Sequence, residues 1–390
     1  VAVCDDTAAL RAALEACRAL PSEGGSLEAD VMASGAALRF LTAFFASRPG
    51  VTAVLRGTDR IHERPMAVLV DALRQCGASI EYLGAEGFAP LRITGKELEG
   101  GAVTVDATVS SQFISALLMV APLMRRGLEL RFDGEPVSLP YITMTLGMMR
   151  RRGIDADREP LRIIVQPGAY AICDPESEGD WSAAAFWYEI SALSSGWIRL
   201  ANLSADSLQG DSAAARFFSC LGVETAPPDD DDATGLELAP SPEVYGRLDL
   251  DLTHNPDLAP PLAATACLIG VPFRLTGLKN LGAKECDRLE AIRLELSRLG
   301  RVVEKIRDFG LEWDGASVPV TSVPEFDCHG DHRMAMALAP AAVYIPGITI
   351  DGAEAVSKSY PEFWNDLRAV GFSMEPVTED ETSAGEEDRR

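Results

Sequence analysis

Lysine is scarce in this sequence: only five of its 390 residues are lysines. Lysine and arginine together number 35 against 59 acidic residues, which gives a formal net charge of −24. Because proteins bind the phosphates of nucleic acids through a positive face, this balance excludes nucleic acid as the expected partner. A site for a small anionic ligand would have to gather its few cations locally. The lysines are Lys96, Lys279, Lys284, Lys305 and Lys358.

The acidic surplus has two interpretations. A lysine-poor, acid-rich composition resembles that of proteins from salt-adapted organisms, where molar salt screens the repulsion between surface charges. An ordinary acidic cytoplasmic protein would show the same balance. Acidic residues are dense at 229–232 and near the C-terminus, where residues 376–390 are expected to form a disordered tail.

The sequence also lacks the segments that mark membrane and secreted proteins. Its uncharged runs, 258–273 and 334–350, are interrupted by proline and glycine and are too short to span a bilayer. No secretory signal is visible. The eight cysteines show no Cys-x-x-Cys spacing, so we expect free thiols in a reducing cytoplasm.

A pattern of an amphipathic helix, a glycine and a short alternating strand occurs five times. Glycine readily takes the left-handed conformation that closes a helix before the chain turns into a strand. The spacings between the glycines are 76, 69, 78 and 71 residues, which fits a small α/β subdomain used repeatedly. The glycines are Gly77, Gly153, Gly222, Gly300 and Gly371.

Each unit contains a second, apolar helix, so its element order is expected to be βαβαββ. A helix at 6–17 would belong to an earlier unit whose first strand and first helix are absent. We therefore expect an α/β fold of six such units, with the opening half-unit, roughly forty residues, missing. The apolar helices are expected at 36–46, 112–124, 183–193, 258–269 and 334–343.

The segment 282–300 is the first candidate for chemistry. Apolar residues at helical spacing from Leu289 predict a helix that begins near Lys284, with Lys284 and Arg288 on one face. Such like charges favour an anion between them, and a bound anion would raise the proton affinity of Glu285, which suits a general acid. The alternative is a solvated helix start with a Glu285–Arg288 ion pair.

Other helix starts carry polar groups that could either cap the helix or bind an anion. Gly35 and Arg39 flank the start of one apolar helix, and Arg64 precedes Pro65 at the start of another. Two hydroxyls and an amide stand at the start of the helix at 112–124, just before its apolar run, and a second polar turn precedes a later helix. These last residues are Ser110, Ser111 and Gln112, followed by Ser138 and Tyr141.

Acidic and imidazole groups form the remaining candidates. Asp257 lies where the uncharged run 258–273 begins, as either a cap or a partly desolvated base. His332 and Arg333 open the helix at 334–343, and Lys358 precedes the last helix. Cys328 and His329 lie near His332, but no second ligand pair with zinc spacing exists elsewhere, so we expect no metal.

Each segment alone is weak evidence for a function. Their order along the chain, however, resembles that of the 5-enolpyruvylshikimate-3-phosphate synthase family over nearly the whole chain. The resemblance implies an inside-out α/β barrel in two lobes that closes over shikimate 3-phosphate and phosphoenolpyruvate, with no cofactor. We expect the N-terminal lobe at 1–177, the C-terminal lobe at 178–375 and a crossover near 174–180. The matching segments are Gly35 to Arg39, Glu63-Arg64-Pro65, Ser110 to Gln112, Ser138 with Tyr141, Asn255-Pro256-Asp257, Lys284 to Arg288, Asp331 to Met336, and Lys358 with Pro361.

The resemblance also implies a role for each matching residue. Asp257 would take the proton from the attacking 5-hydroxyl, Glu285 would protonate the methylene carbon of phosphoenolpyruvate, and Lys284 would assist them. Arg64, Arg288, Arg333 and Lys358 would hold phosphoenolpyruvate, with Gly35, Arg39 and His332 beside them. Ser110, Ser111, Gln112, Ser138, Tyr141, Asn280 and Lys284 would hold the shikimate phosphate and ring.

The sequence departs from the family pattern in two places. The N-terminal Lys-Ser pair with its following Arg has no counterpart, and Ala33 and Ala36 stand where the family has Asn and Thr. If the chain begins at Val1, we expect greatly weakened or absent turnover.

Two alternatives remain open at this point. The first is a UDP-N-acetylglucosamine carboxyvinyltransferase, which has the same two-lobe architecture. The segments around Glu285 and His332 are evidence against this alternative. A non-catalytic homologue could keep the two-lobe clamp and bind ligands without turnover. In each case we expect a cytoplasmic monomer that binds neither nucleic acid nor membrane.

Overall fold

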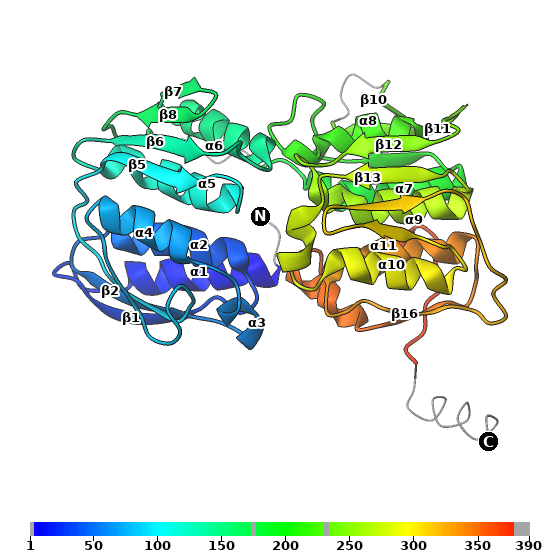
Figure 1. The fold of residues 1–390 in the computed structure, drawn as a ribbon, viewed down its shortest axis with the longest axis horizontal. Helices are drawn as coiled ribbons and strands as arrows, with labels where there is room; N and C mark the ends of the chain where they lie inside the picture. The colour runs from blue at the N-terminus through cyan, green and yellow to red at the C-terminus, as the bar shows by residue number, and fades with distance from the viewer. Residues whose placement is uncertain (1–3, 173–176, 230–233, 378–390) are drawn as a thin grey trace.

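The computed structural model describes residues 4–172, 177–229 and 234–377 of the chain. Figure 1 shows the elements from α1 to β8 in one half of the molecule and those from α7 onward in the other. Most of the expected disordered tail, most of the acidic run at 229–232 and part of the expected crossover lie outside the described residues.

A four-stranded sheet of one design occurs three times. In the first, β1 (Gly25–Asp30) runs parallel to β2 (Val51–Arg56), which pairs antiparallel with β4 (Leu91–Thr94), and β3 (Ser79–Tyr82) pairs with β4. The orders are β1-β2-β4-β3, β5-β6-β8-β7 and β12-β13-β15-β14. The other strands are β5 (Gly101–Asp106), β6 (Leu128–Asp133), β7 (Ala156–Glu159), β8 (Arg162–Val165), β12 (Leu248–Asp251), β13 (Phe273–Thr276), β14 (Glu304–Ile306) and β15 (Gly310–Trp313).

Two smaller sheets complete the strands that the structure describes. In one, β11 (Leu236–Val244) pairs antiparallel with both β10 (Leu221–Ala226) and β9 (Ile198–Leu200). In the other, β16 (Glu325–Asp327) runs parallel to β17 (Thr349–Asp351). Both sheets belong to the second half of the molecule (Figure 1).

The five apolar helices predicted from the sequence are confirmed. They are buried over most of their length, as in α9, where nine of eleven residues are buried, because a helix that is apolar on all sides must pack inside the protein. Two of the predicted ranges end in a 3-10 turn, η1 (Ala121–Leu123) and η5 (Ala339–Val343). The helices are α2 (Gly35–Ala46), α5 (Ser111–Val120), α7 (Trp181–Ser194), α9 (Ala259–Ile269) and α11 (His332–Leu338).

Four of the five glycines follow the end of their amphipathic helix by two residues, as predicted, and Gly222 is the exception. Gly222 lies within β10, at a register shift between Leu221 and Val223, because Cys220 already caps the preceding helix. Gly222 still needs its positive φ of 85° there. The helices are α4 (Ala67–Gln75), α6 (Leu139–Arg151), α8 (Ala214–Ser219), α10 (Arg288–Arg298) and α12 (Phe363–Ala369).

The predicted start of one helix near Lys284 is wrong. α10 begins at Arg288, because the Asp287 side chain caps it by accepting a hydrogen bond from the Glu290 N–H at 3.2 Å. Lys284 instead follows the separate 3-10 turn η4 (Lys279–Ala283). Contrary to the prediction from the sequence, Lys284 and Arg288 therefore do not lie on one face of the same helix.

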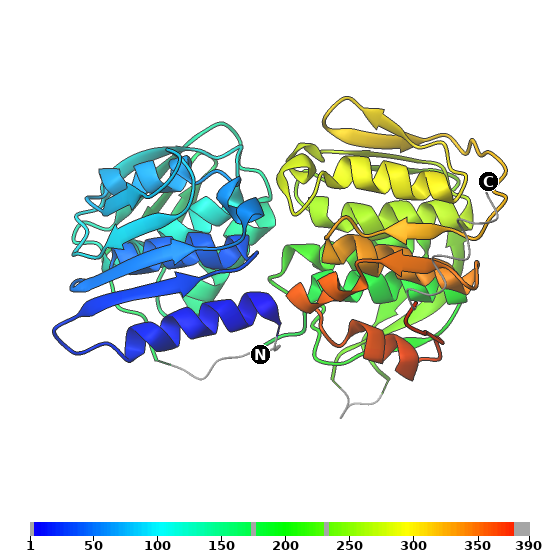
Figure 2. The same ribbon diagram turned by 90° about the horizontal axis from the view of Figure 1, so that it is seen from below.

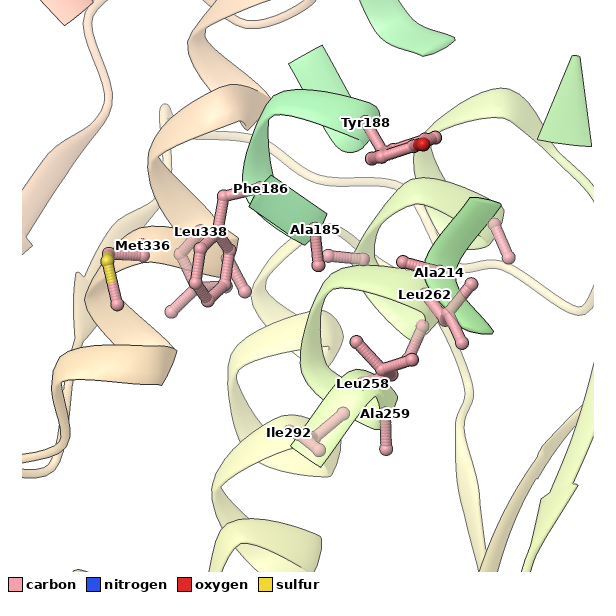
Figure 3. Packing of buried hydrophobic residues seen from close by; sticks show 14 of the residues in the cluster. Ala185, Phe186, Tyr188, Ala214, Leu258, Ala259, Leu262, Ile292, Met336 and Leu338 are labelled. Atoms are coloured by element: carbon pink, nitrogen blue, oxygen red, sulfur yellow. The ribbon is translucent and has the colours of Figure 1, made fainter. Parts of the chain in front are cut away.

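The buried apolar side chains form two separate cores. One contains residues between Ala13 and Val165, and the other contains residues between Trp181 and Leu367. Figure 3 shows part of the second core, which includes Phe186 of α7 and Leu338 of α11, two helices in contact. The two halves therefore each have the buried apolar surface that an independent domain requires.

The first helix reaches from one half of the molecule to the other. α1 (Asp5–Arg18) confirms the helix predicted at 6–17 and packs against β1 and α2. Its first turn meets the 3-10 turn η6 (Ala353–Lys358), as Figure 2 shows near the label N. The Ser357 hydroxyl donates to the Asp5 carboxylate across this contact at 2.7 Å.

None of the helices in the described ranges combines the length and apolar character needed to cross a membrane. The seven cysteines in those ranges carry free thiols. The eighth, Cys173, lies outside the described residues.

Candidate active site

A cavity of about 330 Å³ opens between the two halves of the molecule. Its walls come from the starts of α2, α5 and α6 on one side and from η3 (Pro256–Leu258) and η4 on the other. These are the helix starts that the sequence selected as candidates. Its lining includes Arg39, Arg64, Ser110, Ser111, Gln112, Ser138, Tyr141, Asp257, Asn280 and Lys284.

Arg288 joins three carboxylates beside this cavity. Its guanidinium, 1% exposed, donates to Asp331 at 2.6 and 3.1 Å, to Asp257 at 2.8 Å and to Glu285 at 2.7 Å. A buried charge is stable only when it is paired in this way, because removing it from water costs several kcal/mol. Arg288 therefore fixes the positions of the two acids that the sequence proposed as proton carriers.

Asp257 is the anion that lies between Lys284 and Arg288. Its Oδ1 is 3.2 Å from Lys284 Nζ, and its Oδ2 is 3.6 Å from Arg333 Nη2. Burial alone would raise the pKa of Asp257, but the charges of Lys284, Arg333 and Arg288 lower it far below its usual value. In this structure the carboxylate is ionised and surrounded by cations.

Glu285 occupies a similar position between Arg288 and Lys358. Its Oε1 lies 3.3 Å from Lys358 Nζ. Burial raises the pKa of Glu285, but the charges of Arg288 and Lys358 outweigh burial and lower it well below the usual value. The prediction from the sequence was that bound anions raise the pKa of Glu285. That prediction applies to the protein with its anionic ligands bound, whereas the lowered pKa described here is that of the protein alone.

Arg39 and Arg64 form a second positive group on the other wall. Arg39 donates to Gln112 Oε1 at 2.8 Å, but the buried Nε atoms of Arg39 and Arg64 have no hydrogen-bond partner among the described residues. Burial and the charge of Arg64 lower the pKa of Arg39 to about 9. A Cβ at Gly35 would collide with both guanidiniums, so the glycine makes room for the pair. Two adjacent cations, one buried and one partly buried, favour an anionic ligand.

The hydroxyls at the helix starts, Ser110, Ser111 and Ser138, line the cavity. Ser110 caps α5, because its hydroxyl oxygen accepts a hydrogen bond from the Gln112 N–H at 3.3 Å. Ser138 precedes α6 with a left-handed φ of 51°, and its N–H donates to the Thr253 carbonyl of the other half at 3.3 Å. Ser138 thus marks a place where the two halves touch.

His332 and Arg333 open α11 beside these groups. Burial and the charge of Arg333 lower the pKa of His332 to about 3, so the imidazole is neutral at pH 7. Its Nδ1 has no hydrogen-bond partner within the described part of the chain. The described residues hold no group of three His, Cys, Asp or Glu side chains that could bind a metal.

The sequence analysis missed two acids near the site. Asp6 of α1 lies 3.0 Å from Lys358 Nζ, although acids in a first helical turn usually only complement the helix dipole. Asp211 lies buried in the 3-10 turn η2 (Gly210–Ala213), behind the cavity wall that contains Tyr141. Neither acid has a sequence signal that separates it from an ordinary surface acid, apart from the Gly210 that precedes Asp211.

Residues 14–367 match a family model described as EPSP synthase (3-phosphoshikimate 1-carboxyvinyltransferase). A 3-phosphoshikimate 1-carboxyvinyltransferase from Bacteroides fragilis (strain YCH46) is 45% identical over 373 residues, which cover 95% of this chain and 88% of the relative. The protein of the same name from Syntrophobacter fumaroxidans is 38% identical over 333 residues, covering 85% and 77%.

A solved structure is also similar to this chain. The EPSP synthase from Acinetobacter baumannii superposes with a TM-score of 0.70 at 22% identity, covering 92% of this chain and 81% of the other. This similarity supports an α/β fold of the same kind.

Proposed function

Since the chain belongs to the EPSP synthase (3-phosphoshikimate 1-carboxyvinyltransferase) family, we propose that it transfers the carboxyvinyl group of phosphoenolpyruvate to the 5-hydroxyl of shikimate 3-phosphate and releases phosphate. This step belongs to aromatic amino acid biosynthesis. The observation that carries the proposal is the pair of partly buried acids, Asp257 and Glu285, held by one arginine between two groups of cations.

Two groups of residues around the cavity suit different substrates. The hydroxyls and amides at the starts of α5 and α6, with Asn280 and Lys284, suit the phosphate and ring hydroxyls of shikimate 3-phosphate. The cations around Glu285 suit the carboxylate and phosphate of phosphoenolpyruvate. We assign shikimate 3-phosphate to Ser110, Ser111, Gln112, Ser138, Tyr141, Asn280 and Lys284, and phosphoenolpyruvate to Arg64, Arg288, Arg333 and Lys358, with Gly35, Arg39 and His332 beside it.

In the first step the 5-hydroxyl oxygen attacks C2 of phosphoenolpyruvate, and C3 gains a proton. Asp257 accepts the hydroxyl proton, and Glu285 delivers a proton to C3. Glu285 must be protonated to do so. The charges of bound phosphoenolpyruvate would offset those of Arg288 and Lys358 and raise the pKa of Glu285, which supports this role.

In the second step the C2–O bond to phosphate breaks and C3 loses a proton, so the vinyl group is restored. Glu285, now ionised, can take this proton back. Phosphate leaves with the bond electrons, and positive side chains such as Arg333 stabilise its charge. Asp257 then gives the hydroxyl proton to the departing phosphate, directly or through water, which restores both acids to their starting states. The atoms of both substrates are accounted for in the product and one phosphate, with no metal or organic cofactor in any step.

The wider architecture follows from the same family. We propose two domains, 1–177 and 178–375, on the basis of the two separate cores. We also propose an inside-out barrel of βαβαββ units to which the five described sheets belong, with α1 as part of a sixth unit. The expectations of a cytoplasmic location and a monomeric state accompany this proposal.

The test is an assay of phosphate release with a fixed amount of protein. Phosphate release with shikimate 3-phosphate and phosphoenolpyruvate, but not with UDP-N-acetylglucosamine and phosphoenolpyruvate, is the expected result. Mass spectrometry should show a product heavier by one carboxyvinyl group. Binding of both substrates by calorimetry without phosphate release would contradict the proposal and indicate a binding homologue.

A further inference from the structure

Asp211 lies where the two halves of the molecule meet. The Gly210 carbonyl accepts a hydrogen bond from the Asn255 side chain at 2.7 Å, two residues before Asp257. A Cβ at Gly210 would come within 2.7 Å of Pro140 Cβ, so only glycine allows η2 to pack this closely against α6. The carboxylate that follows Gly210 is therefore held near the cavity wall.

The segment before Asp211 is rigidly tied to the start of α7. The Trp181 N–H donates to Gln209 Oε1 at 3.0 Å, and Gln209 Nε2 donates to Glu178 Oε2 at 3.1 Å. The Ser182 hydroxyl donates to Asp211 Oδ2 at 2.5 Å. These contacts fix both the backbone and one oxygen of the Asp211 side chain.

The other carboxylate oxygen is not used in this structure. Asp211 is 1% exposed, and its Oδ1 has no hydrogen-bond partner among the residues described. An unpaired buried carboxylate oxygen is costly, so its presence beside the cavity calls for an explanation. Burial raises the pKa of Asp211 above its usual value, although the nearby charge of Arg333 acts in the opposite direction. In the ionised carboxylate the unpaired Oδ1 can only accept a hydrogen bond.

Tyr141 is the side chain next to this carboxylate: a Cβ at Gly210, the residue before Asp211, would lie 3.5 Å from Tyr141 Cε2. Tyr141 comes from α6 of the other half and lines the cavity. Burial and the charges of Asp211 and Asp257 raise the pKa of Tyr141 well above its usual value, so its hydroxyl keeps its hydrogen. A single hydroxyl hydrogen that points at Asp211 cannot also point into the cavity.

We propose that Asp211 is a positioning residue that takes the Tyr141 hydrogen and turns a lone pair of the Tyr141 oxygen toward a ring hydroxyl of shikimate 3-phosphate. The inference rests on the proposed function. It makes Tyr141 an acceptor that selects a hydroxyl donor and disfavours a phosphate oxygen at that point of the cavity.

The test uses Asp211→Asn, Tyr141→Phe and the double variant. In Asp211→Asn, the Ser182 hydroxyl should keep its hydrogen bond by donating to the amide oxygen of the new side chain. The amide Nδ2 then faces the Tyr141 oxygen and donates to it. The hydrogen of the Tyr141 hydroxyl must therefore point into the cavity. We therefore expect Asp211→Asn to raise KM for shikimate 3-phosphate about tenfold or more, and to exceed the effect of Tyr141→Phe. KM for phosphoenolpyruvate should change less than threefold.

The double variant provides the readout that a purely structural role would not change. We expect its KM for shikimate 3-phosphate to return to the value of Tyr141→Phe, because no hydroxyl remains to be misdirected. Multiplicative effects of the two substitutions, or an unchanged KM in Asp211→Asn, would overturn the proposal. The matched control is Asp206→Asn, an exposed acid of the same segment.

Two further measurements keep this test independent of folding and of the proposed function. Should Asp211→Asn fail to fold, Ser182→Ala replaces it, with a smaller rise in KM that disappears in the Tyr141→Phe background. Persistence of the Ser182→Ala effect in that background would overturn the proposal. If the wild-type chain releases no phosphate, the proposed function is wrong. Calorimetry can still measure how tightly the same variants bind shikimate 3-phosphate, and this affinity tests the coupling between Asp211 and Tyr141 independently.

Discussion

Asp257 Oδ1 accepts a hydrogen bond from Arg288 Nη1 at 2.8 Å and lies 3.2 Å from Lys284 Nζ. The carboxylate therefore joins two cations that are four residues apart in the sequence but do not share a helix, since Lys284 directly follows η4 and Arg288 begins α10. This arrangement holds the acid ready at the cavity wall. The charge of Arg288 is neutralised by more than one acid, because Asp331 accepts a hydrogen bond from the same guanidinium.

Replacing Asp257 separates its chemical role from its structural one. We expect Asp257→Asn to lower kcat by about 10²- to 10⁴-fold, the range for loss of a general base, with little change in Tm because Asp331 and Glu285 still neutralise Arg288. Phosphate release and thermal unfolding measure the two effects. Asp249→Asn, an exposed acid of β12, is the control. Full activity of Asp257→Asn would remove it from the mechanism.

Glu285→Gln should separate binding from chemistry. Loss of the proton carrier should lower kcat by about 10²- to 10⁴-fold. Loss of its negative charge beside Arg288 and Lys358 should leave phosphoenolpyruvate bound at least as tightly as in the wild type, as calorimetry in the presence of shikimate 3-phosphate would show. Weaker binding together with normal kcat would mean that Glu285 only orders the cations.

Gly35→Ala tests the pair of arginines on the opposite wall. The added Cβ would displace the guanidiniums of Arg39 and Arg64, so we expect KM for phosphoenolpyruvate to rise about tenfold and KM for shikimate 3-phosphate to rise less. Gly84→Ala, whose added Cβ would meet only Pro90 at an ordinary 3.5 Å, is the matched control. Equal kinetics for both variants would exclude Arg64 from binding phosphoenolpyruvate.

Glu189 of α7 gives a prediction about stability. It is fully buried, neither carboxylate oxygen has a hydrogen-bond partner in the described ranges, and burial raises its pKa well above the usual value. The folded state therefore holds a proton that the unfolded state releases above about pH 4.5. The free energy of unfolding should fall as the pH rises above that value, by at most about 1.4 kcal/mol per pH unit from this group.

Glu189→Gln isolates this contribution because the amide does not titrate. We expect the variant to be more stable than the wild type at pH 7 and the difference to vanish near pH 4, as urea unfolding at several pH values would measure. A constant difference across this range would mean that Glu189 is ionised in the folded protein or has a partner.

Local patterns in the sequence were sufficient for the helices. The apolar runs that become α2, α5, α7, α9 and α11 were found because a fully buried helix needs apolar residues on every side. The start of α10 was misplaced, because the Asp287 cap and the charged residues before it are equally compatible with an earlier start. Gly222 was misassigned for a similar reason, since a positive φ serves a strand irregularity as well as a helix end.

The sequence by itself determined the α/β class, the apolar helices, the scarcity of cations and the order of segments that identified the family. Those properties depend on residue type and spacing along the chain. Only the tertiary structure decided that Asp257 lies between Lys284 and Arg288, that Asp6 of α1 meets Lys358, and that the Gly210–Asp211 turn packs against Tyr141. These contacts join residues far apart in the chain, and a short-range pattern carries no information about which distant side chain will neutralise a buried charge.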